Sequence, residues 1–100
     1  MGHLAATSSG KLLESATITS SAALLYGAKL IGGTDNSRLK IYNNTSAAGT
    51  IVWELANAGG TNAGDVNDSV TFKKPIVCSS GIHAVLAGTD AEFEVSYRNQ

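Results

Sequence analysis

Glu92-Phe93-Glu94-Val95-Ser96-Tyr97-Arg98 alternates polar and apolar side chains without interruption. Successive side chains of a β-strand point to opposite faces of the sheet. Phe93, Val95 and Tyr97 are therefore expected to face a core, and the polar residues between them to face outwards. No part of the chain shows a sustained helical spacing of apolar residues. The segment 92–98 predicts a β-strand with one buried face.

The same period of two recurs upstream of this segment. Residues 38–42 place Leu39 and Ile41 on one face, and residues 50–55 align Ile51, Trp53 and Leu55, which we expect in the core. Turn clusters separate such runs at intervals of about 8–12 residues. Shorter β-type runs occur at 16–19, 24–31, 70–72, 76–78 and 82–86. The sequence predicts an all-β fold, a compact antiparallel β-sandwich or jelly-roll-like domain of about seven or eight short strands.

Glycine, proline and polar runs mark the expected irregularities. Gly27 interrupts the run 24–31 and predicts a bulge or bend, and Pro75 predicts a strand start, a bulge or an edge. Asn57–Ser69 is the longest expected loop. Residues 1–14 lack periodicity and are expected to form a flexible N-terminal arm, which leaves 15–100 as a single β-sandwich domain.

Composition favours contact with other proteins. Charged residues make up 15% of the chain, below the roughly 25% usual for soluble domains. The formal net charge is −1 and the basic residues are scattered, so binding to nucleic acid is not expected. No apolar run approaches the roughly 20 residues of a membrane helix, and the first ten residues do not resemble a signal peptide.

The residues capable of catalysis do not form a recognisable set. Cys78, the only cysteine, lies in a β-type run and is expected to be a small core residue, which fits folding in a reducing cytoplasm. His83 is expected at the surface or in an interface. Asp65, Asn67 and Asp68 do not complete a calcium-loop pattern. We expect no enzymatic activity, no metal and no cofactor.

Several stretches carry a resemblance to a known group of proteins. They are 16–21 (Ala-Thr-Ile-Thr-Ser-Ser), 29–33 (Lys-Leu-Ile-Gly-Gly), 40–50 (Lys-Ile-Tyr-Asn-Asn-Thr-Ser-Ala-Ala-Gly-Thr), 75–89 (from Pro-Ile-Val-Cys-Ser-Ser-Gly to Gly-Thr) and 94–97 (Glu-Val-Ser-Tyr). In this order they resemble small β-rich virion proteins of tailed bacteriophages that are often encoded among the head genes. The resemblance covers about residues 15–98, and the N-terminal arm and the Asn57–Ser69 insertion depart from it.

The resemblance implies a virion structural role as a head decoration (cement) protein, made in the host cytoplasm and located on the capsid surface. Its expected partners are the major capsid protein and further copies of itself, with a homotrimer favoured. The N-terminal arm and the sheet edges are expected to carry attachment. The candidate partner contacts are Leu4, Leu12, Leu13, Tyr26, Tyr42, Asn62 and His83.

Two alternatives stay open. A tail- or fibre-associated receptor- or carbohydrate-binding β-module predicts exposed aromatic side chains around the Asn57–Ser69 loop. A small hydrolase or metal-dependent enzyme predicts a cleft in which Cys78, His83 and an acid such as Asp65 converge.

Overall fold

The computed structural model describes residues 6–100, and these residues form eight strands and no helix. No helix that could span a membrane is therefore found among them. The strands are β1 (Thr7–Ser8), β2 (Ala16–Thr19), β3 (Ala23–Ile31), β4 (Ser37–Tyr42), β5 (Ile51–Asn57), β6 (Asn67–Cys78), β7 (Ile82–Ala87) and β8 (Glu92–Asn99).

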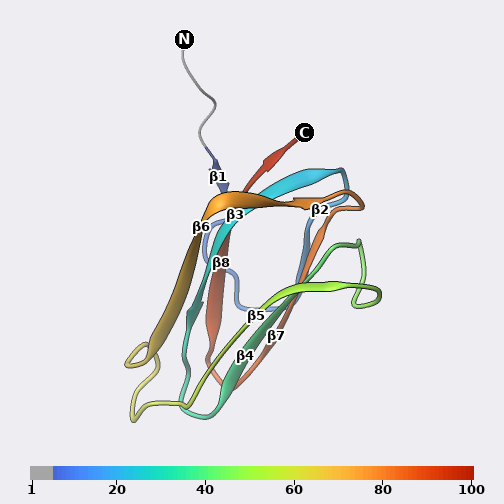
Figure 1. Cartoon of the computed structure of the whole chain (residues 1–100). Coiled ribbons are helices and arrows are strands. Elements are labelled where there is room, and N and C mark those ends of the chain that lie inside the picture. The colour runs from blue at the N-terminus through green and yellow to red at the C-terminus, as the bar shows by residue number, and fades with distance from the viewer. Residues whose placement is uncertain (1–5) are drawn as a thin grey trace.

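The strands form two four-stranded antiparallel sheets that lie face to face (Figure 1). The first sheet has the order β1-β8-β3-β6, and the second has the order β2-β7-β4-β5. The outermost strands in sequence pair with each other, β1 with β8 and β2 with β7, and the inner ones follow, β3 with β6 and β4 with β5. This is one long hairpin rolled up into two layers, the arrangement of a jelly roll. The expected all-β antiparallel sandwich is confirmed.

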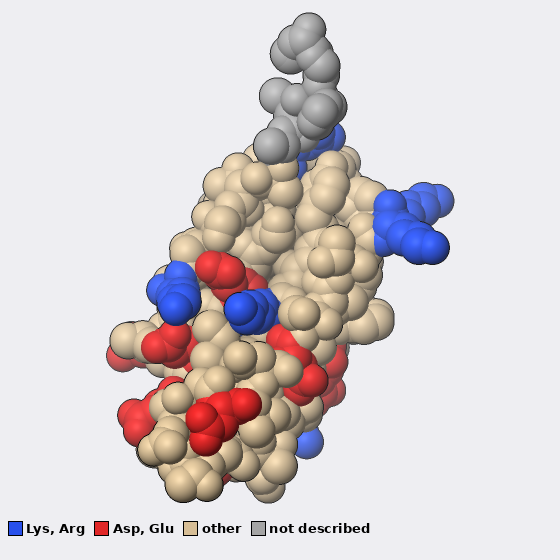
Figure 2. Space-filling view, turned by 90° about the vertical axis from the view of Figure 1, so that its left-hand side faces the viewer, with Lys and Arg blue, Asp and Glu red and all other residues tan. Residues whose placement is uncertain are grey.

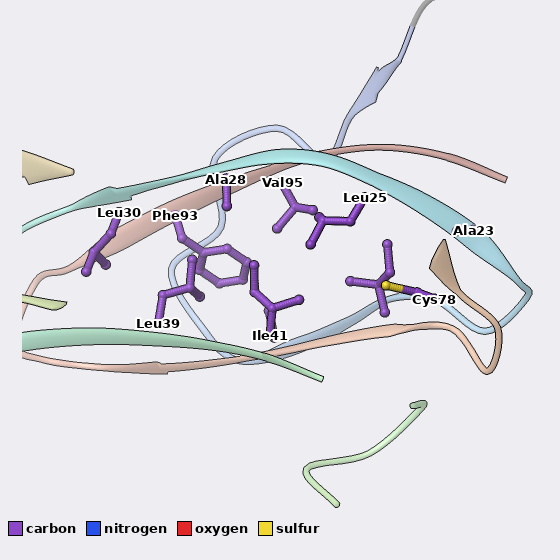
Figure 3. Packing of buried hydrophobic residues seen from close by; sticks show 11 residues of the cluster. Ala23, Leu25, Ala28, Leu30, Leu39, Ile41, Cys78, Phe93 and Val95 are labelled. Atoms are coloured by element: carbon purple, nitrogen blue, oxygen red, sulfur yellow. The ribbon is translucent and has the colours of Figure 1, made fainter. Parts of the chain in front are cut away.

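The core lies between the two sheets and follows the alternation of the strands (Figure 3). Phe93 and Val95 of β8 face Leu39 and Ile41 of β4, and each is at most 1% exposed. Full burial of a side chain of this size stabilises the fold by roughly 1.5–3 kcal/mol. The two strands with the clearest alternation therefore supply both walls of the core.

Gly27 marks an irregularity in the middle of the first sheet, as expected. The register of β3 shifts between Leu25 and Gly27 against both of its neighbours. A Cβ atom at Gly27 would lie 2.5 Å from the Val70 carbonyl oxygen, so the close approach of β6 requires glycine there.

On β6, the partners of Leu25 and Gly27 are Ile76 and Thr71, so residues 72–75 are displaced from the ladder. Pro75 thus lies in a bulge on an edge strand, which confirms its expected position.

The loop between β5 and β6 covers residues 58–66 and is shorter than the expected Asn57–Ser69 loop. Asn67, Asp68 and Ser69 instead begin β6, because they pair with Ile31, Leu30 and Lys29 of β3. The loop is tied to Gly32 and Gly33 by three backbone hydrogen bonds: Gly32 N–H to the Val66 carbonyl (2.7 Å), Gly64 N–H to the Gly32 carbonyl (2.7 Å) and Gly60 N–H to the Gly33 carbonyl (3.1 Å).

The segment expected to form the N-terminal arm lies along β8 from residue 7 onward. Thr7 and Ser8 pair with Tyr97 and Ser96, and Leu12 forms a bridge with Phe93. The structure thus places part of the segment 1–14 at the edge of the first sheet, while its flexibility stays a prediction. Leu4 lies outside the described residues.

Candidate interaction surface

Cys78 is fully buried between the sheets at the end of β6. Burial raises the pKa of its thiol, because the thiolate would lose its hydration there. The expectation of a small core residue is confirmed, and the side chain behaves as part of the hydrophobic cluster.

His83 is half-buried on β7 and is fixed by a polar chain. Its Nδ1 lies 2.9 Å from the Thr17 hydroxyl, which also lies 3.1 Å from the Thr45 carbonyl oxygen. The single hydroxyl proton of Thr17 is donated to that carbonyl, so Nδ1 of His83 carries the proton of the other hydrogen bond. The hydrogen bonds therefore fix the orientation of the ring.

Asp65 lies far from Cys78 and His83. It closes the turn of the β5–β6 loop by accepting the Asn62 backbone N–H (3.0 Å). This loop precedes β6, whereas Cys78 ends β6, so the length of the strand separates the two residues (Figure 1). The cleft that a Cys78–His83–Asp65 site would need is not formed. Within residues 6–100, no three His, Cys, Asp or Glu side chains gather to hold a metal ion.

The structure brings Tyr42 and His83 together. In the second sheet Thr17 pairs with His83, His83 with Tyr42, and Tyr42 with Ile51. The flanking residues Ile82, Ala84 and Ile41 are buried, so these four side chains point away from the core. We call Thr17, His83, Tyr42 and Ile51 the outer row. It crosses all four strands and ends at Ile51, which is 43% exposed.

The prediction that Ile51 and Trp53 lie on the same face of their strand is wrong. Ile51 pairs with Tyr42, but Trp53 pairs with Ile41, and the register shifts between them. Neighbouring residues of β4 point to opposite faces, so Ile51 and Trp53 do as well. The cause is an extra residue, Val52, in β5.

Trp53 also differs from its expected place in the core. It points to the inner side of the second sheet, but β5 is an edge strand, and 38% of Trp53 remains exposed. Its ring meets Phe72 of β6 edge to face, with centroids 4.9 Å apart and an interplanar angle of 82°. We call Trp53 and Phe72 the aromatic rim, because they lie where the two sheets meet at one side. The rim was missed because strand order cannot be derived from a local pattern.

The other candidate contacts are dispersed. Leu12 is half-buried against the core, whereas the adjacent Leu13 is 66% exposed. Tyr26 lies on the first sheet, where the Arg98 guanidinium is 6.0 Å from its ring centroid. Asn62 is exposed at the β5–β6 loop. Of the candidates that lie within residues 6–100, only Tyr42 and His83 share one surface.

A shallow groove of about 430 Å³ crosses the first sheet beside Tyr26. Gly27 is one of the residues that line it. Lys29 and Glu94, which are partners on neighbouring strands, stand beside the groove. Its remaining lining consists of small or uncharged residues: Ala6, Ser8, Ala28, Ser69, Val70, Thr71, Val95 and Ser96.

Acidic side chains gather over the lower part of the molecule on the face shown in Figure 2, while basic side chains are scattered.

Asp35, in the β3–β4 loop, accepts the backbone N–H (2.7 Å) and the hydroxyl (2.8 Å) of Thr89. These two hydrogen bonds lower the pKa of Asp35, and the N–H has the larger effect. This carboxylate therefore has a structural role, since it joins the β3–β4 and β7–β8 connections.

Comparisons of this chain with protein-family models, with curated proteins and with solved structures each found no match.

Proposed function

We propose that this protein is a non-enzymatic structural component of a bacteriophage particle, a decoration protein that binds the outer surface of the head and stabilises it. The setting is supported by the resemblance of residues 15–98 to small virion proteins. The major capsid protein would be its partner.

The observation that carries the proposal is the kind of surface that the fold presents. In the part of the chain that the structure describes, the large apolar side chains that are exposed are Leu13, Ile51, Trp53 and Val77, and the chain has a low charge. Exposed apolar groups surrounded by neutral residues favour protein contacts over the binding of a charged ligand. The jelly roll is compatible with this role, because capsid proteins use it, although lectin domains use it too.

The outer row is the surface that we expect to dock on the capsid. Its Tyr42 and His83 offer flat, partly apolar area with polar tips, and such side chains are suited to interfaces. Thr17 holds His83 in one orientation, which lowers the entropy that docking costs.

The test is purification of intact particles from the phage that encodes the chain, followed by quantitative mass spectrometry. We expect an amount comparable to that of the shell subunit. Replacing Ile51 by Glu should reduce the amount bound, and Thr71→Glu, an exposed residue of the first sheet, serves as the matched control. Absence from particles, or a small number of copies confined to the tail, would contradict the proposal.

A second candidate is a tail-associated module that binds carbohydrate, and the aromatic rim favours it. Trp53 presents over a third of its surface to solvent, and a sugar ring could stack on it. The β5–β6 loop itself, residues 58–66, contains no aromatic residue. Trp53 is the only tryptophan, so a glycan that stacks on it must change the protein's tryptophan fluorescence, whereas a decoration protein should give no change across a glycan panel.

A further inference from the structure

The backbone of the N-terminal segment 6–12 is paired with a single strand of the fold. Its backbone bonds run from Ser9 N–H to the Val95 carbonyl (2.8 Å) and in both directions between Leu12 and Phe93 (2.8 and 2.9 Å). The Val95 N–H also donates to the Ser9 hydroxyl (2.8 Å). These partners all belong to β8. All the groups that hydrogen-bond to this segment therefore lie on β8, at the other end of the sequence.

The link between this segment and β2, residues 13–15, is only just long enough for the distance that it spans. Leu12 belongs to the first sheet through Phe93, and Ala16 belongs to the second sheet through Ala84. Packed sheets lie about 10 Å apart. Four residue steps reach at most about 14 Å even when fully extended. Residues 13–15 must cross this gap and also reverse the chain direction, because the segment and β2 run in opposite directions (Figure 1).

The link also exposes apolar surface. Leu13 is 66% exposed, the highest fraction among the large apolar side chains described. Leu12, its neighbour, packs against the core. A tight link with an exposed leucine between two well-anchored segments favours an open form in which the link straightens.

We propose that the N-terminal segment is exchanged between copies of this chain, so that residues 6–12 of one copy pair with β8 of the next. Exchange keeps every hydrogen bond to β8, because the same groups meet in the same register. It removes the reversal at residues 13–15 and places Leu13 where two copies adjoin. The copies form a closed assembly in which each β8 edge is covered by a neighbour's segment. This inference concerns the isolated protein and does not depend on the proposed function.

The test uses two variants that each add one cysteine to the buried Cys78, Ser8→Cys and Ser96→Cys, because these residues are partners across the ladder. A disulfide fits between two such directly opposed residues. The two variants are unfolded, mixed, refolded together and oxidised. A covalent dimer of one variant with the other is the expected product, because only exchange places the two cysteines side by side. Absence of that dimer, with the circular dichroism of both variants native-like, would overturn the proposal.

Three controls sharpen the result. The unmodified chain should not cross-link, because its Cys78 is fully buried. The double variant Ser8→Cys/Ser96→Cys should give covalent oligomers, whereas a segment paired within its own chain would give an oxidised monomer. Insertion of Gly-Ser-Gly between Glu14 and Ser15 should shift the mixed sample toward monomer, because a longer link can fold back easily. An undiminished yield of mixed dimer from inserted variants would contradict the role of the link.

Discussion

Asp35 holds two connections together through both oxygens of its carboxylate. Its hydrogen bonds with the Thr89 N–H and hydroxyl favour the charged form, so its pKa in the folded protein lies below the ordinary value of 3.8. A lowered pKa means that the unfolded chain binds the proton more tightly. The stability that Asp35 contributes is therefore fully present above pH 3.8 and is lost as the pH falls through the lower pKa of the folded state.

Asp35→Asn should therefore destabilise the protein at neutral pH. The difference in free energy of unfolding between this variant and the unmodified protein should become smaller in strong acid. Urea unfolding of both proteins at neutral pH and at a pH well below 3.8 measures the two differences. Glu14→Gln removes one exposed carboxylate elsewhere and is the matched control. A deficit of equal size at both pH values would show that the charge of Asp35 has no part in the contact.

At the scale of elements, the edge position of β5 determines how much its tryptophan contributes to stability. Phe93 is fully buried on the central strand β8, and its replacement by Ala should cost about 3–5 kcal/mol. Trp53 packs edge to face on Phe72 but is 38% exposed, so Trp53→Ala should cost about 2 kcal/mol.

Urea unfolding followed by circular dichroism measures the loss in free energy of unfolding for both variants. Phe72→Ala should lose about as much free energy of unfolding as Trp53→Ala. The double variant should then lose less than the sum of the two single variants, because each single change already breaks the stacked pair. Equal losses for Trp53→Ala and Phe93→Ala would place Trp53 in the core after all.

The elements that could be predicted are those whose pattern is local. The alternation in 92–98 and 38–42 identified Phe93, Val95, Leu39 and Ile41 as core residues, because a strand between two sheets must bury one face. Gly27 and Pro75 marked real irregularities, because each has a backbone property that a regular ladder does not tolerate.

The elements that could not be predicted depend on distant partners. Asn67–Ser69 is too polar to indicate a strand, yet it pairs with Lys29–Ile31 of β3. Val52 moves Ile51 to the outer face, and only the register with β4 reveals it. The outer row follows the same rule, since Thr17, His83 and Tyr42 are neighbours only through strand pairing.

At the scale of the whole molecule, the rolled connectivity links the two sheets into one unit. Apart from β4 and β5, successive strands belong to different sheets, so neither sheet is a continuous stretch of chain. The core cluster draws on both sheets, from Leu30 and Phe93 on one side to Leu39 and Ile82 on the other. Neither sheet can open without exposing the apolar face of the other.

We therefore predict a single cooperative unfolding transition. Trp53 fluorescence reports the aromatic rim, labelling of Cys78 by a thiol reagent reports the core, and far-ultraviolet circular dichroism reports both sheets. The three probes should give the same midpoint of denaturation and the same free energy of unfolding at one protein concentration. Folding should take milliseconds to seconds, because the strands pair residues that are far apart in the sequence. Cys78 labelling in particular should require global unfolding, since the thiol lies between the sheets. A Trp53 transition that preceded Cys78 labelling would mean that β5 and the rim detach before the core opens. If segments are exchanged, the common midpoint should also rise with protein concentration, because assembly then stabilises the folded state.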